Sequence, residues 1–126
     1  MVNETSNHTT TTHPKLTLNI CLSYGSRGEI LNACRSIAND IQTKTIHSPN
    51  DISESTLSSK MLTYPNPDPD LVIRTSGEYR LSNFLLWQLA YSEMFFIDKN
   101  WPELTKSDLV NIIHSYAIDR KRRYGK

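Results

Sequence analysis

The chain has 126 residues, and its 14 Lys and Arg side chains against 13 Asp and Glu give a formal net charge of +1. This length suits one compact domain with one modest core. The nearly balanced charge excludes a global electrostatic field that would recruit nucleic acid or acidic partners. No apolar run reaches the ~20 residues that a helix needs to cross a bilayer.

The first residues differ in composition from the rest of the chain. Residues 1–13 are polar and rich in threonine, without the charged and then apolar pattern of a secretory signal peptide. Apolar patterning begins abruptly at Leu16. We therefore predict a disordered polar segment over residues 1–15 and a folded domain over residues 16–126.

A strand and a helix are predicted at the start of this domain. Residues 16–22 alternate in polarity and are apolar enough for a buried strand. After a turn, Ser26 and Glu29 have the spacing of a capping box. Apolar residues from Ile30 to Ile41 then follow a helical period. The pattern is that of a strand, a turn and a helix.

The two cysteines are predicted to be free. Cys21 falls in the predicted strand and Cys34 on the apolar face of the predicted helix, and neither has the spacing of metal ligands. Two buried thiols are therefore expected rather than a disulfide, and this fits a reducing compartment.

The middle of the chain predicts a short helix and a second strand. Residues 51–62 can form the helix, starting from Asp51. The prolines between residues 65 and 69 exclude helix and favour extended backbone. Residues 71–74 then read as a strand that runs into a turn at residues 75–77.

The remaining residues predict two helices with a strand between them. Ser82 can cap a helix over residues 83–93 that is apolar nearly all round, and such a helix is buried in a protein or at a subunit interface. Residues 94–97 read as a third short strand, and a capping box at Thr105 and Asp108 starts the last helix.

Alternating strands and helices predict an α/β fold with a parallel sheet flanked by helices. Three strands make a thin sheet, and a parallel sheet needs cover on both faces. The pattern is therefore typical of one half of a larger domain.

Arginines gather where the second predicted strand ends. Arg74 is the last residue of that strand, and Glu78, Arg80 and Ser82 follow within the next loop. Ligands of open parallel sheets bind beyond the carboxyl ends of the strands, and guanidinium groups beside a helix start can bind a phosphate or diphosphate. The spacing equally allows Arg74 or Arg80 to pair with Glu78 and Ser82 only to cap a helix.

Glu93 is the second unusual residue. It ends an almost wholly apolar predicted helix, where the helix dipole disfavours negative charge. A carboxylate in this place can serve a cation, either a metal ion or an arginine. An exposed helix terminus is the alternative.

The stretch from Asp70 to Gln88, which reads DLVIRTSGEYRLSNFLLWQ, closely resembles the signature region of cis-prenyltransferases. This family includes undecaprenyl diphosphate synthase and dehydrodolichyl diphosphate synthase. The resemblance extends upstream through residues 18–20 and 24–27 and downstream through Glu93, residues 101–102 and residues 122–125. It therefore covers nearly everything from Leu16 onward.

The resemblance implies roles for six residues. Arg74, Arg80 and Ser82 would hold the diphosphate of isopentenyl diphosphate, and Glu93 corresponds to the magnesium-binding glutamate of the family. Arg123 and Gly125 match an Arg-x-Gly motif that in the family reaches across the dimer interface toward the active site. Family members pair through helices of this half, so the predicted helix after Ser82 would lie in a homodimer or heterodimer interface.

The chain departs from the family pattern in two ways. Tyr79 stands where some bacterial members carry His, so a ligand role at that position does not carry over. Nothing in the chain resembles the Asp-Gly-Asn-Gly-Arg-Trp segment that holds the allylic diphosphate and magnesium. The resemblance is therefore to the carboxyl-terminal half of the fold, and it implies no catalytic residue in this half.

The function implied is that of a magnesium-dependent prenyltransferase, a transferase of alkyl groups other than methyl. It would add isopentenyl diphosphate to an allylic diphosphate and build a polyprenyl diphosphate, the precursor of dolichol or undecaprenol.

The isolated chain is expected to be a fragment with little activity. The alternatives are a non-catalytic partner subunit of a heteromeric enzyme and an unrelated phosphate-binding module. We expect a cytoplasmic location or one at the cytosolic face of the endoplasmic reticulum, with peripheral membrane contact.

Overall fold

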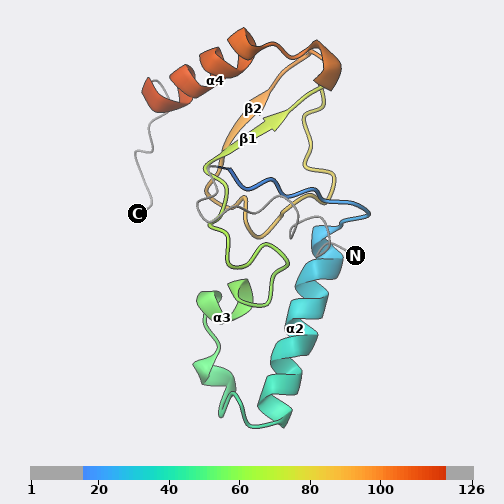
Figure 1. Cartoon of the computed structure of the whole chain (residues 1–126). Coiled ribbons are helices and arrows are strands. Elements are labelled where there is room, and N and C mark those ends of the chain that lie inside the picture. Colours follow the sequence, from blue (N-terminus) through green and yellow to red (C-terminus); the bar gives the residue numbers. More distant parts are fainter. Residues whose placement is uncertain (1–15, 119–126) are drawn as a thin grey trace.

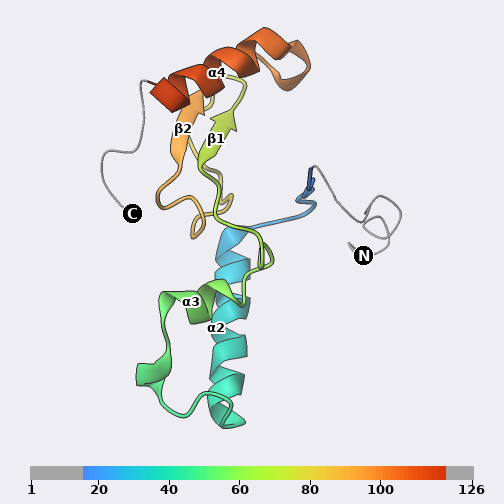
Figure 2. The same cartoon turned by 60° about the vertical axis from the view of Figure 1, so that its left-hand side comes forward.

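The computed structural model describes residues 16–118. In chain order its elements are α2 (Ser26–Gln42), the 3₁₀ helix η1 (Pro49–Asp51), α3 (Glu54–Ser58), β1 (Leu71–Arg74), β2 (Glu93–Phe96), the 3₁₀ helix η2 (Trp101–Glu103) and α4 (Lys106–Ile118). Figures 1 and 2 show α2 and α3 side by side at one end of the molecule and α4 next to the strands at the other. No helix within residues 16–118 is long and apolar enough to cross a membrane.

A two-stranded parallel sheet lies at the centre of the fold. The register pairs Leu71 with Glu93 at one end and Arg74 with Phe96 at the other. Every residue of both strands is half-buried, whereas parallel strands in complete domains are usually covered on both faces. The α/β class and the parallel pairing confirm the prediction from the sequence.

The predicted strand over residues 16–22 does not form. These residues pair with no strand among those that the structure describes. The side chains of Leu16, Leu18, Ile20 and Leu22 are between 64% and 83% exposed. Alternating polarity shows which side chains a sheet would bury, but the strand also needs a neighbour for its backbone hydrogen bonds. β1 and β2 pair with each other and do not provide that neighbour.

The cysteine prediction is half right. Cys21 and Cys34 are both free, as expected, but both are exposed rather than buried. Cys21 lies in the unpaired segment, and Cys34 lies on a face of α2 that the described residues leave open. The buried face of α2 is instead formed by Ala33 and Ile37.

The predicted capping box at the start of α2 is wrong. Gly25 is the N-cap and forms no side-chain capping bond. Ser26 is fully buried, and its Oγ accepts a hydrogen bond from the backbone N–H of Leu86 at 2.9 Å. Its partner in the expected box, Glu29, accepts from the backbone N–H of Leu62 at 2.7 Å. Both polar side chains therefore bind distant segments rather than their own helix end.

Glu29 is the centre of a buried polar cluster. Its carboxylate also accepts hydrogen bonds from Gln88 Nε2, at 3.2 Å, and from the hydroxyl of Tyr24. Burial of Tyr24, together with its hydrogen bond to Glu29, raises the pKa of Tyr24 to about 12. The cluster joins α2 to the segments on either side of β1.

The predicted helix over residues 83–93 is also wrong. This segment forms a series of turns before β2. Ser82, Asn83 and Leu85 have left-handed φ angles of 48°, 64° and 44°, which interrupt a right-handed helix. Leu85 and Leu89 are buried nevertheless, so the apolar composition correctly indicated burial although the helical geometry was not adopted.

The remaining elements follow the sequence more closely. β1 has the predicted bounds, and β2 begins at Glu93, one residue before the predicted strand. The helix predicted within residues 51–62 is present as α3, which is shorter than expected and is capped by Ser53.

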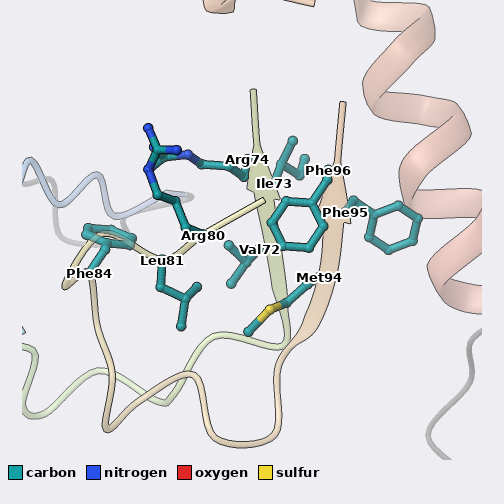
Figure 3. Close-up of a pocket in the computed structure, with 9 residues that line it drawn as sticks. All are labelled: Val72, Ile73, Arg74, Arg80, Leu81, Phe84, Met94, Phe95 and Phe96. Carbon is teal, nitrogen blue, oxygen red and sulfur yellow. The ribbon is translucent and has the colours of Figure 1, made fainter. Parts of the chain in front are cut away.

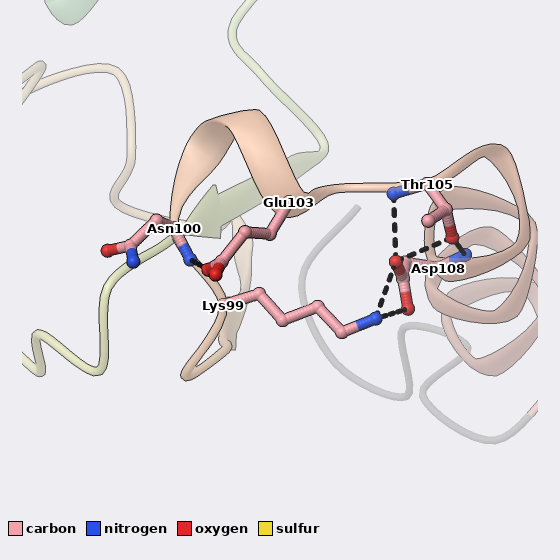
Figure 4. A network of polar contacts seen from close by, with 5 residues as sticks. All are labelled: Lys99, Asn100, Glu103, Thr105 and Asp108. Atoms are coloured by element: carbon pink, nitrogen blue, oxygen red, sulfur yellow. Dashed lines mark hydrogen bonds and ion pairs between the residues drawn. The ribbon is translucent and has the colours of Figure 1, made fainter.

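The capping box at the start of α4 is confirmed. Thr105 N–H donates to Asp108 Oδ2 at 2.8 Å, and Asp108 N–H donates to Thr105 Oγ1 at 3.2 Å. Lys99 Nζ donates to both carboxylate oxygens of Asp108, at 2.7 and 2.9 Å (Figure 4). Hydrogen bonds from Lys99 and then from Thr105 lower the pKa of Asp108 to about 2.

The lowered pKa of Asp108 predicts a loss of stability in acid. Because the folded-state value of about 2 lies below the ordinary value of 3.8, ionised Asp108 stabilises the fold above about pH 4, and this contribution disappears as the pH falls toward 2. We expect an NMR titration of the Asp108 carboxyl to have its midpoint near 2, and a midpoint closer to 3.8 in Lys99→Met. An identical midpoint in the variant would show that Lys99 does not cause the shift.

The buried position of Glu29 predicts a stability cost when its carboxylate is removed. Glu29→Ala leaves the Leu62 N–H without its acceptor and removes one of the two acceptors of Gln88 Nε2, which keeps its hydrogen bond to Thr63 Oγ1. We expect the free energy of unfolding in urea to fall by about 1–3 kcal/mol. Glu54→Ala, at the exposed start of α3, is the matched control and should cost about 0.5 kcal/mol. Equal losses in the two variants would contradict the role of the cluster.

Candidate anion-binding site

The turn after β1 positions the two arginines predicted from the sequence. Arg74 ends β1, and its carbonyl accepts from Ile97 N–H at 2.9 Å. Ser76 and Gly77 have left-handed φ angles of 71° and 64°. Their N–H groups donate to Lys99 O at 2.9 Å and to Ile97 O at 3.0 Å. These bonds attach the turn to the residues after β2, and the chain then returns toward the sheet with Arg80.

Arg74 and Arg80 line the same cavity. The cavity has a volume of about 230 Å³. In Figure 3 the two guanidinium groups extend to the same side of it, while apolar side chains form the remaining wall. That wall includes Val72, Leu81, Phe84, Met94 and Phe96. Two cations beside an apolar wall suit an anion with an apolar tail, because the apolar surroundings strengthen charge-assisted hydrogen bonds.

Arg80 also forms the ion pair that the sequence left open. Its guanidinium contacts the carboxylate of Glu78, and the Arg80 side chain is 65% exposed. A pair this exposed contributes about 0–1 kcal/mol. Charge-assisted hydrogen bonds that the Arg80 guanidinium donates to a phosphate are of comparable or greater strength, so the pair with Glu78 does not prevent Arg80 from binding an anion.

Ser82 and Glu93 are less closely associated with the cavity. Ser82 is exposed and is not among the residues that line it. Glu93 begins β2 opposite Leu71, whereas Arg74 lies opposite Phe96. Glu93 is therefore three residues, or about 10 Å, along the strand from the level of Arg74. It starts a strand and does not end a helix, so the helix-dipole argument for a nearby cation does not apply.

Within residues 16–118 no group of three or more His, Cys, Asp or Glu side chains is placed to hold a metal ion. Mg²⁺ is commonly bound by one or two carboxylates together with water and substrate phosphates. Glu93 could provide one such ligand, but the described residues do not form a magnesium site by themselves. Arg123 and Gly125 lie outside the described residues.

Asn83 and Phe84 are residues of the site that the sequence patterns did not single out. Asn83 O accepts from Ser26 N–H, and Asn83 Oδ1 accepts from Arg27 N–H, both at 2.8 Å. Phe84 lines the cavity and packs edge-on against Tyr24, with ring centroids 5.9 Å apart. The residue type at position 83 was the one signal in the sequence, because Asn is enriched in left-handed backbone and therefore indicates a turn rather than a helix.

The family model for undecaprenyl diphosphate synthases matches residues 1–125. The chain belongs to the cis-prenyltransferase family. It is 48% identical over 116 residues to an isoprenyl transferase of Prochlorococcus marinus, which corresponds to 92% of this chain and 42% of that protein. It is 50% identical over 108 residues to a tritrans,polycis-undecaprenyl-diphosphate synthase (geranylgeranyl-diphosphate specific) of Picrophilus torridus, with 86% of this chain and 42% of that protein covered.

A solved structure of another protein has a similar fold. The crystal structure of lavandulyl diphosphate synthase from Lavandula x intermedia, in complex with dimethylallyl diphosphate, superposes with a TM-score of 0.73 at 39% identity. The match covers 82% of this chain and 43% of that chain. This cis-prenyltransferase chain thus spans less than half of the length of the relatives it matches.

Proposed function

We propose that this chain provides the isopentenyl diphosphate-binding part of a cis-prenyltransferase that extends an allylic diphosphate into a polyprenyl diphosphate. The observation that carries the proposal is the shared cavity of Arg74 and Arg80 at the carboxyl end of β1. The names of the related isoprenyl transferases and undecaprenyl diphosphate synthases support the reaction type.

The cavity matches both parts of such a substrate. Arg74 and Arg80 can each donate paired hydrogen bonds to diphosphate oxygens. Leu81, Phe84 and Met94 offer an apolar surface to the five-carbon group. Ser82 follows Arg80 closely in the chain and would reach the same diphosphate by a change in its rotamer or in the loop.

The reaction itself needs two substrates. The double bond of isopentenyl diphosphate attacks the allylic carbon as the bond from that carbon to its diphosphate breaks. A new carbon–carbon bond forms, one proton leaves, and inorganic pyrophosphate is released. The contribution proposed for this chain is to bind and orient the attacking substrate, which lowers the entropic part of the barrier.

Magnesium dependence remains a proposal. Glu93 is proposed as one carboxylate ligand, supported by the match of its surrounding sequence to the family. A complete site would need oxygen donors from the substrates or from outside residues 16–118, because no suitable cluster occurs within this range.

Association with a second chain is also proposed. The turns after Ser82 expose parts of Phe84, Leu86 and Tyr91, which could contribute to a homodimer or heterodimer although they do not form the expected helix.

A non-catalytic partner subunit is the alternative function. Retention of both arginines in one cavity favours the substrate-binding role. We also propose a location in the cytoplasm or at the cytosolic face of the endoplasmic reticulum.

Replacement of Arg80 should weaken binding of isopentenyl diphosphate. Arg80→Ala removes a charge-assisted contact of about 1.5–3 kcal/mol, which corresponds to an increase in Kd of about 10- to 150-fold. Titration calorimetry with isopentenyl diphosphate measures this change. Arg35→Ala, on the exposed surface of α2, is the matched control. Unchanged affinity in Arg80→Ala would remove Arg80 from the site.

Prenyl transfer should require more than these 126 residues. With labelled isopentenyl diphosphate and an allylic diphosphate, we expect no polyprenyl product from the purified chain. A chimera with the unmatched portion of the Prochlorococcus marinus isoprenyl transferase should form product, and Arg80→Ala should reduce it. Product from the purified chain by itself would contradict the need for the additional portion. A correctly folded chimera without activity would contradict the enzymatic role.

A further inference from the structure

The loop that carries the proposed substrate-binding residues is held at its first end by the sheet. This clamp loop consists of residues 78–82, and it follows the turn in which Ser76 and Gly77 hydrogen bond to Lys99 and Ile97. The start of the clamp loop is therefore fixed relative to the end of β2. Only five residues separate this attachment from Asn83.

The other end of the clamp loop is attached to α2 through the hydrogen bonds of Asn83, the residue that follows the loop. The donors to Asn83 are the N–H groups of Ser26 and Arg27, in the first turn of the helix. Such groups have no acceptor within their own helix. Because Gly25 provides no side-chain cap, Asn83 supplies acceptors from 56 residues away in the sequence.

The contact leaves no room for a side chain at position 25. A Cβ on Gly25 would lie 2.8 Å from Nδ2 of Asn83. This is closer than ordinary Cβ contacts, so one of the two groups would have to move. The left-handed φ of 64° at Asn83 is a conformation in which Asn is enriched and glycine is readily accommodated.

The same contact places one wall of the cavity. Phe84 follows Asn83 directly, meets Tyr24 edge-on and lines the cavity together with Arg74 and Arg80. Displacement of Asn83 would therefore move an apolar wall and the end of the clamp loop together.

We propose that Asn83 is a positioning residue for the diphosphate-binding arginine, which acts by docking the end of the clamp loop onto the amino terminus of α2. The proposal rests on the proposed function, because it assigns this role within the same site. A loop attached at both ends has fewer conformations to lose when a ligand binds, so more of the contact energy of Arg80 appears as affinity. Release of the second attachment removes this advantage without removing any group that touches the diphosphate.

The first test compares Asn83→Gly with the wild-type chain of 126 residues. Glycine tolerates the left-handed backbone but lacks the Oδ1 acceptor for Arg27 N–H. We expect Kd for isopentenyl diphosphate and for inorganic pyrophosphate, measured by calorimetry on folded protein, to rise about three- to tenfold, in line with the loss of a helix cap. Asn50→Gly, at an exposed position in η1, is the matched control and should leave Kd unchanged.

The second test combines Asn83→Gly with Gly25→Ala. Gly25→Ala should weaken pyrophosphate binding in the wild-type background, because its Cβ displaces the Asn83 side chain. In the Asn83→Gly background the clash is absent, so Gly25→Ala should have almost no further effect. Such a non-additive result assigns both effects to one contact.

The outcomes separate this inference from the proposed function. Wild-type affinity in Asn83→Gly, with a clear loss in Arg80→Ala, would overturn the positioning role and leave the proposed function intact. Independent, additive effects of Gly25→Ala and Asn83→Gly would also overturn it. A wild-type chain that binds neither pyrophosphate nor isopentenyl diphosphate would overturn the proposed function, and the inference with it.

Discussion

The structure depends on the contact between the amino terminus of α2 and the turns that follow Ser82. Ser26 is fully buried there. Its N–H donates to Asn83 O, and its Oγ accepts from Leu86 N–H. Unsatisfied polar groups are costly to bury, and this contact satisfies groups of the helix end and of the turns at once. The left-handed residues at this contact, Ser82, Asn83 and Leu85, interrupt the helix that the composition of the segment favours.

The buried carboxylate of Glu29 extends this contact to the segment that precedes β1. It joins Tyr24 to Leu62 and Gln88, from segments that precede and follow β1. Since the hydrophobic core of the described residues is small, polar contacts carry much of the attachment of α2 to the segments that precede β1 and β2. Both strands stay half-buried among the described residues, whereas parallel strands are usually covered on both faces.

The proposed site combines a local and a non-local component. Arg74 is fixed by the end of β1, and the turn at Gly77 returns the chain so that Arg80 reaches the same cavity. Phe84 also lines the cavity, and its ring packs against Tyr24, which is far away in the sequence. Glu93 lies at the other end of the paired strands, so the substrate-binding and metal-binding parts that the family resemblance implies are spatially separate within this chain.

The amino-acid sequence by itself determined β1, the turn after it, the capping box of α4 and the membership of the family. The capping box depends only on residues three positions apart, Thr105 and Asp108, so the residue pattern reveals it directly. Tertiary structure alone decided that Ser26 and Glu29 bind distant segments, that residues 16–22 stay unpaired and that Asn83 caps α2. The physical reason is that a polar side chain or an apolar strand can satisfy its bonds with several partners, and only the packing of remote segments selects among them.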